Sequence, residues 1–246
     1  MTTAHEQPSP TALPAKPEVH HDHRDVTGGW LRPAVFGAMD GLISNFSLIS
    51  GFSGAHASRH LVILSGLGGL VAGAFSMAVG EYVSVASQGD LARAEIEVER
   101  YELRNNAAAE QAELAELYIS RGVDRALALE VSRQLSRDPD QALKIHSREE
   151  LGVSVDDLPS PYLAAGSSFV SFSIGAALPL LPFVFGASSL WPAAIVAGLA
   201  LILAGTLVAR ITARPWWFGS LRQLLLGAVA AAVTYGVGAA IGTHIT

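Results

Sequence analysis

Two carboxylates and one thioether lie inside long apolar stretches, where polar groups are costly to bury. Asp40 lies about nine residues into a stretch that begins at Leu31, near the middle of a membrane-spanning helix that rises about 1.5 Å per residue. Ionisable side chains at this depth usually mark an ion or proton pathway. Met77 and Glu81 are four residues apart in a second stretch, so they share one helix face and offer sulfur and oxygen ligands suited to a first-row transition ion. Together with Asn45, they predict a translocation path.

Each of these residues also has a purely structural interpretation. Asp40 would then hold a helical bundle together by hydrogen bonds, and Met77 would fill a gap in an apolar core. A carboxylate at the bilayer centre costs at least about 2.5 kcal/mol, which favours a functional role for Asp40. For Met77 both interpretations stay open.

A second group of candidate ligands follows in three sets of acidic residues at helical spacing. Like charges one turn apart destabilise an isolated helix by about 0.2–0.5 kcal/mol per pair, so such sets indicate a compensating divalent cation. Carboxylates without thiolates suit Fe²⁺ or Mn²⁺. The candidate metal ligands are Glu99, Glu102, Glu110, Glu113, Glu116, His146, Glu149 and Glu150. The alternative is a solvated helix face balanced by Arg100, Arg104 and Arg148.

The charges that carry this chemistry are unevenly distributed along the 246 residues. Half of the chain is hydrophobic, 15% is charged, and there is no cysteine, which excludes a disulfide scaffold and a thiolate metal site. The net charge of −6 argues against nucleic acid as a partner. Residues 90–158 hold 16 acidic and nine basic residues, a net charge of −7, whereas the remainder is nearly neutral. This pattern predicts a membrane protein with one acidic insert.

Five apolar stretches are each close to the length of about 20 residues that a membrane-spanning helix needs. They predict an all-α membrane protein with five transmembrane helices and a cytoplasmic helical metal-binding insert between the second and third. Pro179 and Pro182 should kink or end the third helix. The stretches cover approximately Leu31–Phe52, Leu61–Ser87, Tyr162–Phe185, Leu190–Ala209 and Leu221–Ile241.

The domain boundaries and the orientation follow from the same pattern. We expect a flexible cytoplasmic tail at 1–29, transmembrane helices 1 and 2 at 30–89, the acidic metal-binding domain at 90–158, and helices 3–5 at 159–246. With the N-terminus inside, 15 of the 16 Lys and Arg residues are cytoplasmic and only Arg59 is outside. Short loops and the lack of an organellar targeting segment favour a bacterial inner membrane. The tail histidines His20, His21 and His23 are either metal ligands or incidental.

Within the insert, breaks in the pattern predict separate helices. The second span should continue to about residue 104, and Asn105 and Asn106 should end it and cap a helix over 107–120. Further helices are expected over about 124–136 and from Pro139 to Leu151. No catalytic motif for a nucleophile, a zinc hydrolase or a phosphate-binding loop is present, so we do not expect an enzyme or a prosthetic group.

Two long motifs resemble those of the vacuolar iron transporter family. The first is the run DGLISNF at 40–46, and the second is GAFSMAVGEYVSVASQ at 73–88. The glutamate-rich insert and the runs at 148–152 and 161–165 follow the same layout. The resemblance extends over about residues 30–241.

This resemblance implies a five-span homodimer that exports Fe²⁺, and often Mn²⁺, from the cytoplasm in exchange for protons. The path residues of the family correspond to Asp40 and Met77. Some members have a Met and a Glu where this chain has His146 and Ser147, which leaves metal preference and stoichiometry open. The cytoplasmic metal-binding glutamates of the family correspond to Glu99, Glu102, Glu110, Glu113 and Glu150. The alternative function is a membrane-anchored metal-sensing or metal-storage scaffold without transport, which would leave the two path residues unexplained.

Overall fold

The computed structural model describes residues 29–245, with side-chain environments up to Gly242. Apart from Gly29, the predicted tail lies outside the described residues, and so do the candidate ligands His20, His21 and His23. Within the described part of the chain all regular structure is helical. The helices are α1 (Leu31–Gly54), α2 (Arg59–Asn105), α3 (Ala107–Ser120), α4 (Arg125–Leu135), α5 (Pro139–Glu149), α6 (Pro161–Ala177), α7 (Leu181–Val184), α8 (Trp191–Ile211) and α9 (Trp216–Ile245).

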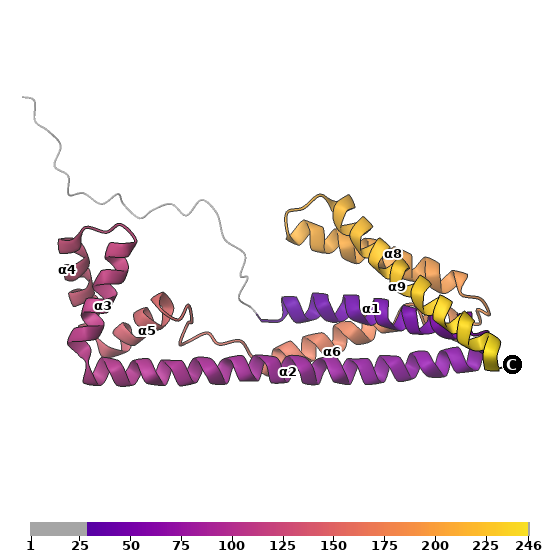
Figure 1. The fold of residues 1–246 in the computed structure, drawn as a ribbon, viewed down its shortest axis with the longest axis horizontal. Coiled ribbons are helices and arrows are strands. Elements are labelled where there is room, and N and C mark those ends of the chain that lie inside the picture. The colour runs from indigo at the N-terminus through magenta and orange to yellow at the C-terminus, as the bar shows by residue number, and fades with distance from the viewer. Residues whose placement is uncertain (1–28, 246) are drawn as a thin grey trace, which may run out of the picture.

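The second predicted span and its extension form one continuous helix. α2 has 47 residues, which corresponds to a length of about 70 Å, and the apolar core of a bilayer is about 30 Å thick. Figure 1 shows α1 and α6 lying along one half of α2, while α3, α4 and α5 gather at its other end. The predicted continuation of this helix beyond Asp90 is therefore confirmed.

Four helices, α1, α2, α8 and α9, are long and apolar enough to cross a membrane. The third predicted span is not one continuous helix: α6 has only 17 residues and is followed by a turn and the short α7. The break lies at Pro179, which has no N–H group with which to continue the helical ladder, and Pro182 is the second residue of α7. The interruption predicted from these prolines is confirmed, whereas five uninterrupted spans are not found in residues 29–245.

Small residues allow α1 and α6 to pack closely. A Cβ atom added at Gly37 would lie 2.6 Å from Ser171 Oγ and 2.7 Å from the Ser168 carbonyl oxygen, which leaves room for glycine only. Asn45 on α1 ties the same two helices together because its side-chain amide donates to the Ala176 carbonyl over 2.6 Å. Hydrogen bonds of this kind replace the hydrophobic driving force that is missing between helices in lipid.

The last two helices are joined by a similar close contact. Gly205 on α8 and Gly219 on α9 face each other, and a Cβ at Gly205 would lie 2.5 Å from the Gly219 carbonyl oxygen. Beside them, the hydroxyls of Thr206 and Ser220 share a hydrogen bond of 2.8 Å. α9 then runs to the C-terminal end of α1, so the bundle is closed at the end opposite to the insert (Figure 1).

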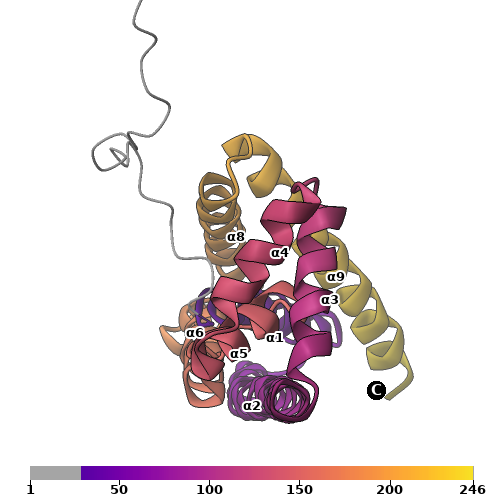
Figure 2. The same cartoon turned by 90° about the vertical axis from the view of Figure 1, so that its left-hand side faces the viewer.

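The insert folds as three short helices over the end of α2. Figure 2 shows α3 and α4 side by side, with α3 rising from the end of α2 and α5 between α4 and α2. Asp124 and Asp138 cap α4 and α5 through their side chains, and Gly122 has a φ of +94°, as expected for a residue that ends a helix. The break at Asn106 is confirmed, but its side chain does not cap α3 because its amide donates to Glu102 instead.

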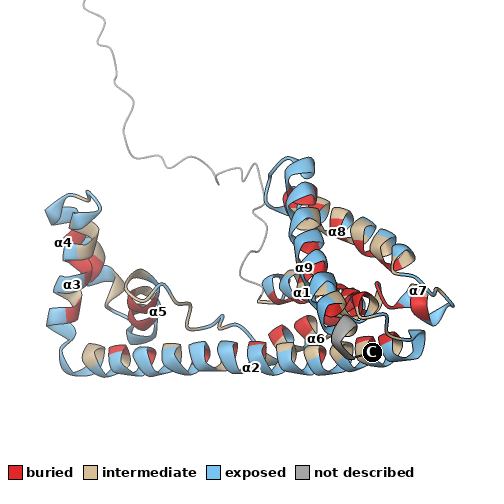
Figure 3. Ribbon diagram, turned by 45° about the vertical axis from the view of Figure 1, so that its right-hand side comes forward, coloured by how far each residue is buried: buried red, intermediate tan, exposed pale blue. Residues whose placement is uncertain are grey.

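Burial is concentrated in the bundle around α1 and α6. α2 carries few buried residues along its length, as Figure 3 shows, although it has the most residues of any helix described. Large apolar side chains such as Phe75 and Val79 are 60% exposed. This surface suits lipid or another apolar partner.

The glycine contact between α1 and α6 gives a direct test of the packing. We expect Gly37→Ala to destabilise the protein by about 1–3 kcal/mol, because the added methyl group would collide with the backbone of α6. Gly68→Ala is the matched control, since no atom lies within 4 Å of its added Cβ, and alanine favours a helix by about 0.8–1.0 kcal/mol. Thermal unfolding in detergent, followed by tryptophan fluorescence, would measure both. Equal melting temperatures for the two variants would contradict the packing.

Candidate metal centre and membrane pocket

Four predicted ligands from three helices meet in the insert. Glu99 of α2, Glu110 of α3, and His146 and Glu150 at the end of α5 each offer one ligand atom, and these atoms all lie within 4.8 Å of one another. His146 Nδ1 lies 3.0 Å from Glu99 Oε1, 2.9 Å from Glu150 Oε1 and 3.7 Å from Glu110 Oε2. The imidazole is fully buried, and Glu99 and Glu110 are each 8% exposed.

These donor atoms converge without bonding to one another. Among the described residues, Glu99 Oε1, Glu150 Oε1 and both imidazole nitrogens of His146 are buried and have no hydrogen-bond partner. These atoms are therefore close together, but their relative orientation does not allow hydrogen bonds. Two ligands at right angles, each about 2.1 Å from an octahedral metal ion, are about 3.0 Å apart, which matches the two short separations. The cluster fits a divalent cation bound by one imidazole and three carboxylates.

Burial and mutual repulsion shift the proton equilibria of this cluster. Removal from water, with a smaller contribution from the charges of Glu150, Glu110 and Glu113, raises the pKa of Glu99 to about 7. Burial also raises the pKa of Glu110, and the neighbouring Glu113 adds to this rise, while His146 opposes it. A cation bound among these carboxylates would remove the penalty that their charges impose.

The other four candidate ligands in the insert lie outside this cluster. Glu102 accepts a hydrogen bond from Asn106, and Glu113 is exposed, although its charge influences the buried carboxylates. Glu116 forms an ion pair of 3.2 Å with Arg125, and Glu149 pairs with Arg121. The described structure thus brings together Glu99, Glu110, His146 and Glu150 and leaves Glu102, Glu113, Glu116 and Glu149 nearer to solvent.

A signal that could have separated the two groups is present in the sequence. Each clustered residue on a helix lies one turn from an apolar residue that the fold buries. These pairs are Ile96 and Glu99, Leu114 and Glu110, and Leu143 and His146. The carboxylates that continue an apolar stripe are the ones that the fold removes from water.

A second candidate site lies within the apolar bundle. Asp40, Asn45 and Met77 line one pocket of about 350 Å³, together with Ser44 on α1 and Phe172 on α6. Asn45 Oδ1 is buried and has no hydrogen-bond partner among the described residues, so a carbonyl oxygen is free to bind a cation. The pocket therefore combines a carboxylate, an amide oxygen and a thioether, a mixed set of hard and soft ligands.

Glu81, the fourth predicted path residue, lies outside this pocket and has a partner that the sequence pattern did not reveal. It is buried, and Arg32 at the start of α1 donates to its Oε2 over 2.9 Å. The arginine is 70% exposed, so the pair connects the buried carboxylate to the solvent-facing end of α1. Glu81 is thus a neutralised carboxylate four residues from Met77, toward the insert.

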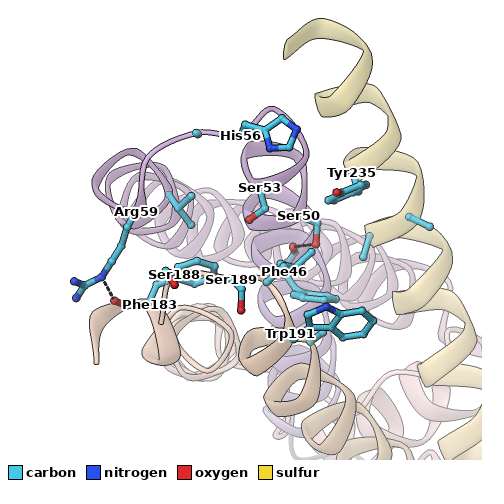
Figure 4. A pocket seen from close by; sticks show the side chains of 16 residues that line it. Phe46, Ser50, Ser53, His56, Arg59, Phe183, Ser188, Ser189, Trp191 and Tyr235 are labelled. Carbon is cyan, nitrogen blue, oxygen red and sulfur yellow. Dashed lines mark hydrogen bonds between the residues drawn. The ribbon is translucent and has the colours of Figure 1, made fainter. Parts of the chain in front are cut away.

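A larger pocket of about 760 Å³ opens at the opposite end of the bundle. Figure 4 shows Ser50 and Ser53 of α1 beside it, with Tyr235 of α9 across the cavity, and Arg59 turned outward to bond the Phe183 carbonyl oxygen over 2.7 Å. Hydroxyls and aromatic rings line this cavity, but no carboxylate does. It therefore offers no charged ligand to a divalent cation, and we assign it no part in metal binding.

Comparison with known proteins connects these two sites to a family. A sequence profile described as the VIT family matches residues 31–239, which include every helical element from α1 to most of α9. The chain belongs to the VIT family. The match covers Asp40 and Met77 in the bundle as well as the insert cluster.

Individual VIT relatives cover most of the chain. A protein of Acanthamoeba castellanii called vacuolar iron transporter is 40% identical over 215 residues, which is 86% of this chain and 78% of that protein. Vacuolar iron transporter 1 of Oryza sativa subsp. japonica is 31% identical, covering 92% of this chain and 91% of its own length. Vacuolar iron transporter homolog 1 of Arabidopsis thaliana is 36% identical, covering 87% of this chain and 84% of its own length. The resemblance found in the motifs is therefore confirmed.

The buried cluster predicts a specific loss of metal binding. Glu99→Gln removes a charged ligand while it preserves side-chain size, so we expect the affinity of the full-length protein for Mn²⁺ to fall at least about tenfold. Glu95→Gln is the matched control, because Glu95 lies one turn earlier on α2 and is exposed. Isothermal titration calorimetry would compare the two variants. An unchanged affinity in Glu99→Gln would favour the solvated-face interpretation.

The raised pKa of Glu99 also predicts how stability depends on pH. The unfolded chain releases this proton near pH 4.5, whereas the folded protein holds it to about pH 7, so the metal-free protein should lose stability as the pH rises between these values. We expect Mn²⁺ to raise the melting temperature more at pH 8 than at pH 6, because the ion competes with protons for the carboxylates.

Melting curves of the wild type and of Glu99→Gln at both pH values would measure this linkage. The variant should lose most of the pH dependence, whereas Glu95→Gln should retain it. The prediction would be wrong if the metal-free wild type became more stable from pH 6 to pH 8 and Glu99→Gln showed the same pH dependence. Other groups would then dominate the pH dependence of stability.

Proposed function

We propose that this VIT-family protein exports Fe²⁺, and also Mn²⁺, from the cytoplasm in exchange for protons. The observation that carries the proposal is that one helix serves two sites with metal-ligand chemistry. α2 contributes Glu99 to the insert cluster and Met77 to the membrane pocket, about 33 Å apart along its axis. Relatives named vacuolar iron transporters support iron as the transported ion.

The first step in this mechanism is capture of the cation in the insert. Glu99, Glu110 and Glu150 supply negative charge out of water, and His146 supplies a nitrogen ligand. One imidazole with three carboxylates and no sulfur suits a first-row divalent ion such as Fe²⁺ or Mn²⁺. Because binding displaces the proton that Glu99 retains near neutral pH, capture is coupled to proton release.

Transfer into the bilayer follows the face of α2. Glu81 receives the ion at the inner end of the bundle as Arg32 leaves its carboxylate, and Met77 then presents sulfur toward the pocket. Asp40 alternates between metal and proton, since a lone carboxylate in an apolar bundle needs one or the other to stay neutral. This alternation makes the exchange of metal for protons obligatory.

Orientation and assembly form part of the same proposal. The start of α1 and the α8–α9 turn lie at the end of the bundle from which α2 leads to the insert (Figure 1). These segments carry Arg32, Arg210 and Arg214, which supports a cytoplasmic insert and N-terminus. We also propose that the protein is a homodimer, as the resemblance of its motifs to those of the family implies. The exposed apolar surface of α2 is available to a second copy. The bacterial inner membrane stays a prediction, and no enzymatic activity is proposed.

Flux measurements in proteoliposomes test the transport mechanism. We expect Asp40→Asn to reduce Mn²⁺ uptake and the accompanying change in lumenal pH at least about tenfold, equivalent to about 1.4 kcal/mol in the transport barrier. Asp90→Asn is the control, because Asp90 is exposed and paired with Arg93 on the surface of α2. A metal-sensitive dye and a pH-sensitive dye inside the vesicles would report both ions at once.

Two outcomes would contradict the proposal in different ways. Normal exchange by Asp40→Asn would remove this residue from the path and leave the transport function in place. Metal binding by the wild-type protein without any flux would favour the alternative of a sensing or storage scaffold.

A further inference from the structure

The turn between α8 and α9 forms a basic pocket that the proposed transport does not use. Its volume is about 420 Å³. Arg214, Arg222 and Thr212 line it, together with the apolar residues Val208 and Phe218. The chemistry of the pocket is therefore that of an anion site with an apolar side.

The positive charge at this turn has no balancing carboxylate. The sequence contains no acidic residue after Asp157, and Arg210, Arg214 and Arg222 form no ion pair within residues 29–245. Six other arginines in the described chain do pair with carboxylates, namely Arg32, Arg93, Arg100, Arg121, Arg125 and Arg133. The turn is therefore a local excess of cationic side chains.

The backbone holds the two pocket arginines in place. Ala213 adopts a left-handed φ of +53°, which lets the Arg214 N–H donate to the Ala209 carbonyl over 2.8 Å and close the end of α8. The guanidinium of Arg222 lies 6.0 Å from the centre of the Phe218 ring, a cation–π distance. The backbone of Arg214 and the side chain of Arg222 are thus both positioned beside one cavity.

The surroundings of the pocket indicate where its ligand comes from. Trp216 and Trp217 begin α9 with their rings 60% and 55% exposed, as is usual at the boundary between lipid and water. On α9, Leu225 and Leu226 lie one turn beyond Arg222 on the same helix face, are 56% and 57% exposed, and continue away from the turn into the apolar part of the bundle. A lipid with its headgroup beside the arginines would place its acyl chains along this face of α9.

We propose that this basic pocket binds the phosphate group of an anionic glycerophospholipid from the membrane leaflet on the insert side. Arg214 and Arg222 hold the phosphate oxygens, because the planar guanidinium matches phosphate with two parallel hydrogen bonds. Basic pockets between transmembrane helices bind anionic headgroups in this way. Binding at this turn ties α8 and α9 to one lipid and is independent of metal transport.

Native mass spectrometry of the full-length protein, released from nanodiscs of phosphatidylcholine with a fraction of phosphatidylglycerol, tests the proposal. We expect phosphatidylglycerol to be retained in preference to phosphatidylcholine. Arg214→Gln and Arg222→Gln should each reduce its apparent affinity about five- to tenfold. Arg214→Lys should give an intermediate loss, because it keeps the charge and loses the planar fork.

Arg210→Gln is the matched control, since Arg210 lies at the same end of α8 and does not line the pocket. Its apparent affinity for phosphatidylglycerol should stay within about twofold of the wild type. A loss equal to that of Arg214→Gln would mean that general surface charge attracts the lipid, and it would overturn the proposal. Millimolar inorganic phosphate should not displace the lipid, and displacement would assign the pocket to a soluble anion instead. If Arg214→Gln does not fold, Arg222→Gln and Arg214→Lys carry the same test.

Discussion

The structure depends on one constraint: each carboxylate that is held away from water needs a neutralising partner. The chain meets that need in three ways. Arg32 neutralises Glu81 at the inner end of the bundle. Glu99 retains its proton to about pH 7 in the insert. Asp40 faces a pocket in which, within the described structure, no arginine or lysine takes part. The sites therefore differ in what neutralises the carboxylate, and a cation would bind most easily where no fixed positive charge lies beside it.

Packing between the helices holds these carboxylates in position. Glycine contacts set α1 against α6, and the amide of Asn45 fixes one of its groups to α6 while its oxygen stays unpartnered. In the insert the positions depend on short helices with strong end signals, such as Asp138 and Pro139 at the start of α5. Local sequence thus determines each helix, and close packing then brings distant ligands together.

Helix boundaries followed from the sequence because they depend on residues near the boundary itself. The aspartate and serine caps at the starts of α4, α5 and α6, and the first-turn prolines of α5 and α6, act within one turn, so their effect is visible without the fold. The choice among the eight insert ligands was visible only indirectly, through apolar residues one turn from Glu99, Glu110 and His146, because it depends on which carboxylates α3 and α5 cover when they pack on α2. The same applies to Arg32 and Glu81, which are 49 residues apart in sequence.

The unbroken length of α2 has a mechanical consequence. Met77 and Glu99 are separated by 22 residues, so at 100° per residue they lie only about 40° apart around the helix axis. No break in α2 separates the two residues, so their relative orientation is fixed by the helix itself. A rotation of α2 at Glu99 on cation binding would therefore also turn Met77 and change the shape of the membrane pocket.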